Sequence, residues 1–446
     1  MAQTLKFGNG TWATKKDSIL AYNDENENYK PLPFNYTGAG KGTRVNKEGL
    51  IEVVENDRPR IDYLDSEDGV FLLENASTNL VTYSEAFDNS SWTKSEVSVN
   101  PNNVISPNGT LNADAIIEST TSNAYHRVLP TTPISGTGGT NYSCSVYVKK
   151  KGDTRHIYWF IQKGADAFYV HIDMTNYVVG DSNSSGSGNL VDASITPVGN
   201  DWYRISVSGV VSSISGDYYN QIYLNKQLGS GFTPTQYTGD GTSGLYLWGW
   251  QLEQNSVASS YIPTQGTIQT RLAETANGSG NSEVFNDSEG VLFAELNIDA
   301  NDGNFRFLSI SDGTSTNAVW LYYRSDANQI NFRVIVGGVS SFDQIYTINN
   351  ATLNTKLLLK YKENDFSAWV NGFEVLTDNS GITFSGNVLN ELEFNRPDGI
   401  NNFYGKTKEI GYYNTILTDI ELETLTSYRT WLSMVKELNL NVIYNG

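Results

Sequence analysis

Two carboxylates in the C-terminal third of the sequence have a spacing that glycoside hydrolysis could use. Glu391 and Glu393 lie two positions apart in the segment NELEFN. On a β-strand they would share one face, and a retaining glycosidase holds its two carboxyl groups roughly 5 to 5.5 Å apart. The same alternation places Asn390, Leu392 and Phe394 toward a core and both carboxylates in water, where neither gains the raised pKa of a general acid. We therefore expect no catalysis from this pair.

Calcium is the ligand that other acidic residues could bind. The segment DANDGN at residues 299–304 resembles a calcium loop only loosely, because its glycine comes one position too early and the distal glutamate is missing. An ordinary turn explains this segment, as it explains the Asp-Gly pairs at Asp312 and Asp398. We expect no cofactor, with calcium kept as the alternative.

Thiol chemistry is not expected. Cys144 is the only cysteine, which excludes an intramolecular disulfide and a cysteine-based metal site. It alternates with Tyr142 and Val146 in YSCSVYV and therefore reads as a buried core residue. None of the three histidines lies in a catalytic signature.

Aromatic side chains are the groups that a sugar binder needs, because an indole or phenol face packs against the apolar face of a pyranose ring. The chain has 27 Tyr and 9 Trp. Our candidate glycan contacts are Trp159, Trp250, Trp320, Tyr322 and Trp369. Core packing is the competing interpretation for each, and in LYLWGWQLE, around Trp250, both faces of the strand are apolar.

Short alternating runs separated by turn residues are the elements that must position these side chains. Examples are RHIYWFIQK, WYRISVSGVV, NAVWLYYRS and TKLLLKYKE. Such runs are typical of β-sandwiches and jelly rolls. Asn371-Gly372 in AWVNGFEV predicts a hairpin with a type I′ turn. The fold class that we expect is all-β.

One helix is expected, at the C-terminal end. Thr418 and Glu421 form a capping box, and the helix would run to about Glu437. Its apolar face would be formed by Ile420, Leu425, Tyr428, Leu432, Val435 and Leu438. Such a helix is roughly 30 Å long, more than the ~17 to 20 Å of one sandwich edge. Its surplus turn, with Trp431, therefore predicts burial between copies in a homo-oligomer.

Charge excludes some classes of partner. The chain of 446 residues has 49 acidic and 30 basic side chains, a net charge of −19, which disfavours nucleic acid and anionic lipid. The N-terminus lacks the apolar stretch of a signal peptide, and no segment approaches the ~18 apolar residues of a membrane span. We expect synthesis in the cytoplasm and no membrane insertion.

Composition divides the chain into four parts. Residues 1–75 have too few apolar runs for a core of their own and read as an extended N-terminal anchor. Residues 76–265 and 284–446 each contain enough strands for a sandwich domain, and the second would include the helix. Residues 266–283, with ETANGSGNSE, read as a linker.

The order of short segments near the N-terminus is specific. LKFGNGTWATKKDS, TRVNKEGLIEVVENDRPRIDYL and GVFLLENASTNLVTYSEAFDN follow one another, and this series resembles the opening of fibre and appendage proteins of tailed bacteriophages, especially phages of Bacteroidota. Residues 76–265, which close with LYLWGWQLEQNSVASSYIPT, resemble a carbohydrate-binding-module-like jelly roll. Residues 284–446, with EGVLFAELNI, AWVNGFEV and FYGKTKEIGYYNTILTDIELETL, resemble a laminin-G or concanavalin-like lectin sandwich.

The resemblance implies a structural virion protein, a fibre or appendage. Its N-terminal segment would attach to other virion proteins, its two sandwiches would bind host surface glycans, and a trimer is the favoured oligomer. It implies no enzyme, because the pattern E-x-D-x-x-E of concanavalin-like glycosidases is absent. The alternatives are a connector protein without glycan binding and a secreted accessory module of a polysaccharide-active enzyme.

Overall fold

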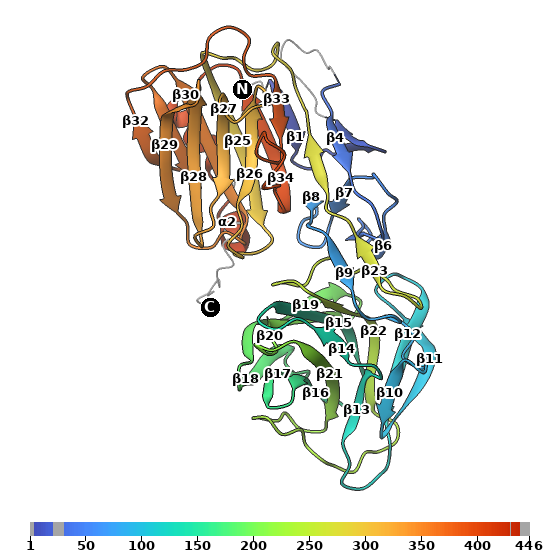
Figure 1. Cartoon of the computed structure of the whole chain (residues 1–446). Coiled ribbons are helices and arrows are strands. Elements are labelled where there is room, and N and C mark those ends of the chain that lie inside the picture. Colours follow the sequence, from blue (N-terminus) through green and yellow to red (C-terminus); the bar gives the residue numbers. More distant parts are fainter. Residues whose placement is uncertain (1–3, 21–30, 429, 438–446) are drawn as a thin grey trace, which may run out of the picture. The chain divides into compact units, whose positions relative to one another are not determined.

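The computed structural model describes residues 4–20, 31–428 and 430–437, which form two compact units built almost entirely of β-strands (Figure 1). The central unit comprises Gly40–Val54 and Ala76–Leu272. The C-terminal unit comprises Met1–Ala39, Glu55–Asn75 and Ala273–Gly446. The expected all-β fold with two sandwiches is confirmed.

The central unit is a sandwich of two antiparallel sheets. The seven-stranded sheet contains β10 (Trp92–Ser95), β13 (His126–Pro130), β14 (Ile134–Gly136), β16 (His156–Lys163), β17 (Asp166–Asp173), β18 (Val178–Ser185) and β21 (Gly216–Asn225). The six-stranded sheet contains β11 (Val97–Ile105), β12 (Leu111–Glu118), β15 (Asn141–Lys151), β19 (Asn189–Gly199), β20 (Trp202–Val210) and β22 (Gly244–Glu253). Two short pairs complete the unit, β9 (Ser77–Asn79) with β23 (Gln269–Arg271) and β5 (Thr43–Val45) with β6 (Ile51–Val53).

The core of the central unit lies between its two sheets. Cys144 and Val146 of β15 meet Ile157 and Trp159 of β16 there, because alternate residues of each strand point inward. Cys144 is fully buried, and burial raises the pKa of its thiol well above the usual value. The predicted core role of Cys144 is confirmed.

The C-terminal unit is a second sandwich. Its eight-stranded sheet contains β1 (Leu5–Gly8), β7 (Arg60–Asp62), β8 (Val70–Leu73), β25 (Glu289–Ile298), β30 (Thr355–Lys362), β31 (Phe366–Val370), β32 (Phe373–Asp378) and β34 (Gly405–Tyr413). Its five-stranded sheet has the order β29 (Val339–Thr347), β28 (Gln329–Val336), β27 (Ala318–Tyr323), β26 (Arg306–Ser311) and β33 (Glu391–Glu393). A four-stranded sheet contains β2 (Ala13–Lys15), β3 (Ser18–Leu20), β4 (Phe34–Thr37) and β24 (Thr275–Asn277).

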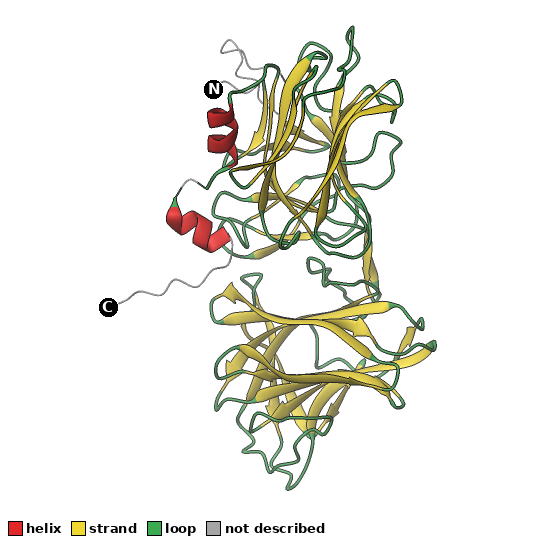
Figure 2. Ribbon diagram, turned by 90° about the vertical axis from the view of Figure 1, so that its left-hand side faces the viewer, coloured by secondary structure: helices red, strands yellow, loops and turns green. Residues whose placement is uncertain are grey.

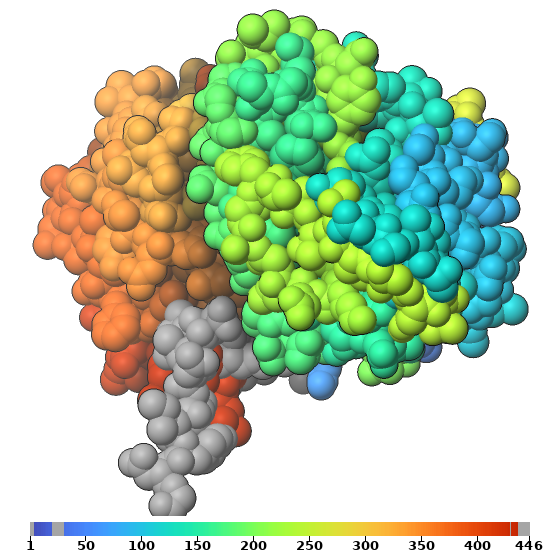
Figure 3. Space-filling view, turned by 90° about the horizontal axis from the view of Figure 1, so that it is seen from below, coloured from blue at the N-terminus to red at the C-terminus, as the bar shows by residue number. Residues whose placement is uncertain are grey.

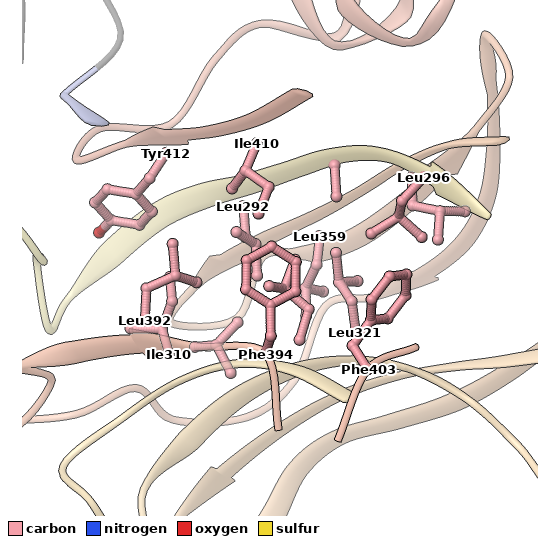
Figure 4. Packing of buried hydrophobic residues seen from close by; sticks show 14 of the residues in the cluster. Leu292, Leu296, Ile310, Leu321, Leu359, Leu392, Phe394, Phe403, Ile410 and Tyr412 are labelled. Carbon is pink, nitrogen blue, oxygen red and sulfur yellow. The ribbon is translucent and has the colours of Figure 1, made fainter. Parts of the chain in front are cut away.

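Side chains from the two larger sheets of this unit point toward each other (Figure 4). Leu292 and Ile410 come from the eight-stranded sheet, and Ile310, Leu321 and Leu392 come from the five-stranded sheet. The hairpin predicted at Asn371-Gly372 joins β31 to β32, and both turn residues have positive φ, +49° and +90°. This confirms the expected turn.

The structure corrects the expectation that residues 1–75 form a separate extended segment. β1 and β8 both pair with β34, so N-terminal strands complete the eight-stranded sheet. Leu5, Phe34 and Phe71 are buried in the core of the C-terminal unit. The segment has few apolar residues because it adds to a core that the distant residues 284–413 largely supply.

The expected linker at residues 266–283 is also structured. β24 within it pairs with β4, and Ser279 is fully buried and forms a bridge with Leu392. Glu274 lies in a buried network: its carboxylate accepts hydrogen bonds from the Arg60 guanidinium and, at 2.7 Å, from the Tyr36 hydroxyl. Composition did not predict the structural roles of Glu274 and Ser279, because polar residues can also stabilise a fold, through buried hydrogen bonds and ion pairs.

The C-terminal helix is broken into two. α1 (Asp419–Thr426) begins as predicted, with the Thr418 amide donating to the Glu421 carboxylate, but Ser427 is extended and ends it. α2 (Trp431–Glu437) follows, and both helices are shown in red in Figure 2. Leu438, expected on the same face, lies outside the described residues. No helix in the described part of the chain is long and apolar enough to cross a membrane.

Candidate functional site

The five-stranded sheet of the C-terminal unit has an outward face that is rich in aromatic residues. Leu308 and Ile310 of β26 point into the core. Because side chains alternate along a strand, Phe307 points to the opposite, outward face of the sheet. The registers of the strands place Trp320 of β27 beside Arg333 of β28 and opposite Ser309 of β26. Residues far apart in sequence thus form one continuous surface.

A pocket of about 320 Å³ lies on this face, and we call it the Trp320 pocket. It is lined by Phe305, Phe307, Ser315, Trp320, Tyr322, Arg333, Ile335, Gly338, Arg396 and Asn401. The rings of Phe307 and Tyr322 stack with centroids 4.2 Å apart and planes 6° from parallel. Trp320 meets Phe307 edge to face at 5.4 Å. The three rings therefore pack against one another to form an aromatic wall.

Two guanidinium groups border the pocket. Arg333 lies over the Trp320 ring, 5.5 Å from its centroid, and contacts Asp343 through Nε at 3.2 Å. Arg396 comes from the loop after β33 and contacts Asp398 at 2.9 Å. Both carboxylates lie outside the pocket lining. They fix the direction of the two guanidinium groups without occupying the pocket.

Trp320 and Tyr322 each carry one further polar group. Trp320 is only 4% exposed, and its indole Nε1–H finds no hydrogen-bond partner among the described residues. Burial, with Asp343 nearby, raises the pKa of Tyr322, so its hydroxyl keeps its proton at neutral pH. Arrangements of this kind, in which an apolar wall carries a few fixed polar groups, are typical of small-molecule sites.

The structure separates the five aromatic candidates. Trp320 and Tyr322 lie together in the Trp320 pocket. Trp159 and Trp250 lie in the core of the central unit, with ring centroids 5.6 Å apart and exposures of 1% and 0%. Trp369 packs with Leu422 of α1 on the eight-stranded sheet. Sugar contact is therefore wrong for Trp159, Trp250 and Trp369, because their rings are buried and lie outside the Trp320 pocket.

Several pocket residues were not among the sequence candidates. Phe305 and Phe307 lie two positions apart in NFRFLSIS. This spacing could have indicated that both rings share one face of the strand. Arg333 could be placed only once the register of β27 and β28 was known. Arg396 and Asn401 come from a loop that no periodicity describes.

The expectation for the segment around Glu391 and Glu393 is wrong in two respects, of which the first is that Asn390 is exposed and not in the core. Leu392 does face the core as predicted, but Glu393 is only 8% exposed. Burial, reinforced by Glu391, raises the pKa of Glu393 to about 7. The Asn395 amide nitrogen lies 3.1 Å from Glu393 Oε2 when it is turned toward that carboxyl. Neither glutamate lines the Trp320 pocket.

The segment at residues 299–304 uses its carboxylates internally. Arg306 contacts Asp299 at 3.2 Å and Asp302 at 2.8 Å. The Gly303 backbone has a φ of +80°, as the turn interpretation requires. Within the described ranges, no group of three His, Cys, Asp or Glu side chains could hold a metal ion.

The central unit has an aromatic face of its own, formed by Tyr158, Tyr169 and Tyr223. The connection between β21 and β22 crosses it: the Tyr158 hydroxyl donates to the Phe232 carbonyl at 2.9 Å, and the Phe232 ring lies 4.4 Å from Tyr169. The yellow-green atoms of this connection lie at the surface of the central unit in Figure 3. The tyrosine face is therefore largely covered.

Comparisons with known proteins give limited likenesses. No protein-family model matches the sequence, and a search of the curated proteins found no match. Among solved structures, the Ruminococcus gnavus IT-sialidase CBM40 bound to alpha2,3 sialyllactose is 17% identical, with a TM-score of 0.29 over 34% of this chain and 94% of that chain.

Two other solved structures match over longer stretches. Domains LG4-5 of the mouse laminin alpha1 chain are 11% identical with a TM-score of 0.22, covering 66% of this chain and 86% of that one. Trypanosoma rangeli sialidase is 12% identical with a TM-score of 0.27, covering 92% of this chain and 81% of that one. Scores this low establish neither a family nor an activity.

Proposed function

We propose that this protein is a virion appendage of a tailed phage that binds host surface glycans, and that the Trp320 pocket is a glycan site. One observation supports the binding role most strongly: stacked aromatic rings and two held guanidinium groups border the same pocket on an outward sheet face. Aromatic rings would take the apolar face of a sugar, and the guanidinium groups would bond its oxygen atoms.

The appendage role rests on the ordered N-terminal segments that resemble phage fibre proteins. In this proposal the N-terminal strands hold the C-terminal sandwich together and also carry the surface that contacts other virion proteins. Immunogold labelling of intact particles with an antibody against this protein tests the location. Label on the particle supports the appendage role, and its absence from purified particles contradicts it.

A glycan array with the full chain tests binding. Wild type is compared with Trp320→Ala, which removes the pocket wall, and with Phe373→Ala, which removes an aromatic ring that is 72% exposed elsewhere on the same unit. We expect wild type and Phe373→Ala to bind the same glycans and Trp320→Ala to lose them. Binding of no glycan by wild type would favour the alternative, a connector protein without a sugar site.

The proposal includes no catalysis. Glu393 has the raised pKa that a general acid needs, but its carboxyl group and that of Glu391 lie outside the pocket, and the glycosidase pattern is absent. Incubating wild type and Glu393→Gln with each bound glycan tests this point. Cleavage by wild type that disappears in the variant would make the protein an enzyme.

A further inference from the structure

The charges that line the Trp320 pocket have one sign. The lining contains two arginines and no aspartate or glutamate, although the whole chain has 19 more acidic than basic side chains. The electrostatic potential inside a small pocket follows the nearest groups, because more distant charges are screened by water and salt. The lining itself is thus cationic, although Asp343 and Asp398 pair with the two arginines just outside it.

The contacts that Arg333 and Arg396 make within the protein leave some of their N–H donors available to a ligand. Ser340 Oγ accepts from Arg333 Nη2 at 2.8 Å and from Nε at 3.1 Å, and Asp343 contacts the same Nε. A guanidinium group has five N–H donors, so these contacts use only part of its capacity. The side chains of Arg333 and Arg396 are 30% and 36% exposed, and solvent therefore reaches them.

The remaining polar groups add donors. The Tyr322 hydroxyl keeps its proton, and Ser315 and Asn401 each have at least one N–H or O–H donor. A site with so many donors and no carboxylate acceptor fits a ligand with several negatively charged oxygens.

We infer, on the basis of the glycan-binding function proposed above, that the ligand is an acidic sugar whose carboxylate or sulfate group contacts Arg333 and Arg396. The aromatic wall takes the ring of that sugar, and a volume of about 320 Å³ has room for one or two sugar residues. Asp343 and Asp398 reduce the net charge from outside the lining, so the affinity is modest and falls as salt is added.

Calorimetric titration of the full chain with matched sugars tests the inference. The probes are one disaccharide in three forms: with a uronic acid, with the corresponding neutral hexose, and with that hexose sulfated. We expect both acidic forms to bind at least about tenfold more tightly than the neutral form, because charge-assisted hydrogen bonds are the stronger ones. Preference for only one acidic form identifies which anionic group the site takes.

Two arginine variants connect this preference to the pocket. Arg333→Gln and Arg396→Gln should each reduce the acidic preference, while Arg324→Gln, on the same unit but outside the lining, should not. If a variant fails to fold, the salt dependence of wild-type binding still decides. Equal binding of acidic and neutral forms, independent of salt, overturns the inference and leaves glycan binding intact. Binding of none of the three forms, together with an empty glycan array, overturns the proposed function itself.

Discussion

The Arg333 guanidinium lies over the Trp320 indole ring, with Cζ 5.5 Å from the ring centroid. Arg333 comes from β28 and Trp320 from β27, and the two residues are directly opposite in the register of these strands. A cation over an indole face contributes roughly 0.5 to 2 kcal/mol, depending on its exposure. The contact therefore joins the charged and the aromatic parts of the pocket into one unit.

The buried carboxyl of Glu393 makes stability depend on pH. Its pKa is about 7 in the folded protein, against an ordinary value of 4.5, so between these pH values the folded state binds more protons than the unfolded state. Stability contributed by this group therefore falls as pH rises from 4.5 to 7. We expect Glu393→Gln to raise the free energy of unfolding by about 1 to 3 kcal/mol at pH 8, the upper value being reduced by solvent screening, and to change it little at pH 4.

Urea denaturation at the two pH values measures this difference. Glu363→Gln is the control, since Glu363 is exposed in the turn before β31. Equal effects of Glu393→Gln at pH 4 and pH 8 would contradict the assignment of a protonated Glu393.

The Arg60 network predicts that the N-terminal segment is required for the C-terminal sandwich. Arg60 and Glu274 are 1% and 3% exposed, and Glu74 contacts the same guanidinium at 2.8 Å. Breaking such a buried pair costs about 3 to 5 kcal/mol. We expect Glu274→Gln to destabilise the protein by about this amount, whereas Glu55→Gln, which removes an exposed pair with Arg58, changes stability by about 1 kcal/mol or less.

Deletion of residues 1–75 extends the same test. The deletion removes β1, β7 and β8 from the eight-stranded sheet, so the C-terminal unit should lose its protection against proteolysis. A truncated chain whose C-terminal unit resists protease like wild type would show that these strands are dispensable.

Helix α1 should stabilise the sheet that it covers. Leu422 is fully buried against Trp369, whereas Ile420 on the same helix is 77% exposed. We expect Leu422→Ala to cost about 2 to 5 kcal/mol and Ile420→Ala to have almost no effect, as judged from denaturation midpoints. Similar losses in both variants would mean that α1 does not pack by this face.

Helix α2 carries the exposed apolar groups that favour association. Trp431 and Leu432 are 67% and 64% exposed, while Val435, expected beside them, is only 7% exposed. We propose that Trp431 and Leu432 contact another copy in a homo-oligomer, with a trimer favoured. Light scattering should show the wild-type oligomer dissociating in the variant with Trp431→Ser and Leu432→Ser. A monomeric wild type, or an oligomer unaffected by both changes, would contradict this role.

Local patterns predicted the strands, the Asn371-Gly372 turn and the start of α1, because each depends on neighbouring residues. They did not distinguish Trp320 from Trp369, which have similar exposures of 4% and 5%. The difference lies in the surroundings of each ring: Trp320 lines a pocket, whereas Trp369 packs against α1. Arg396 lies in a loop. Its position at the pocket depends on how strands distant in sequence pair, which local patterns do not predict.

The most direct test of the central claim is calorimetric titration of a glycan identified on the array into wild type, Trp320→Ala and Phe373→Ala. Near-ultraviolet circular dichroism first confirms that each variant is folded. We expect Trp320→Ala to weaken binding by at least about tenfold, as the loss of a central aromatic contact does, and Phe373→Ala to bind like wild type. Unchanged affinity in folded Trp320→Ala would show that the Trp320 pocket is not the glycan site.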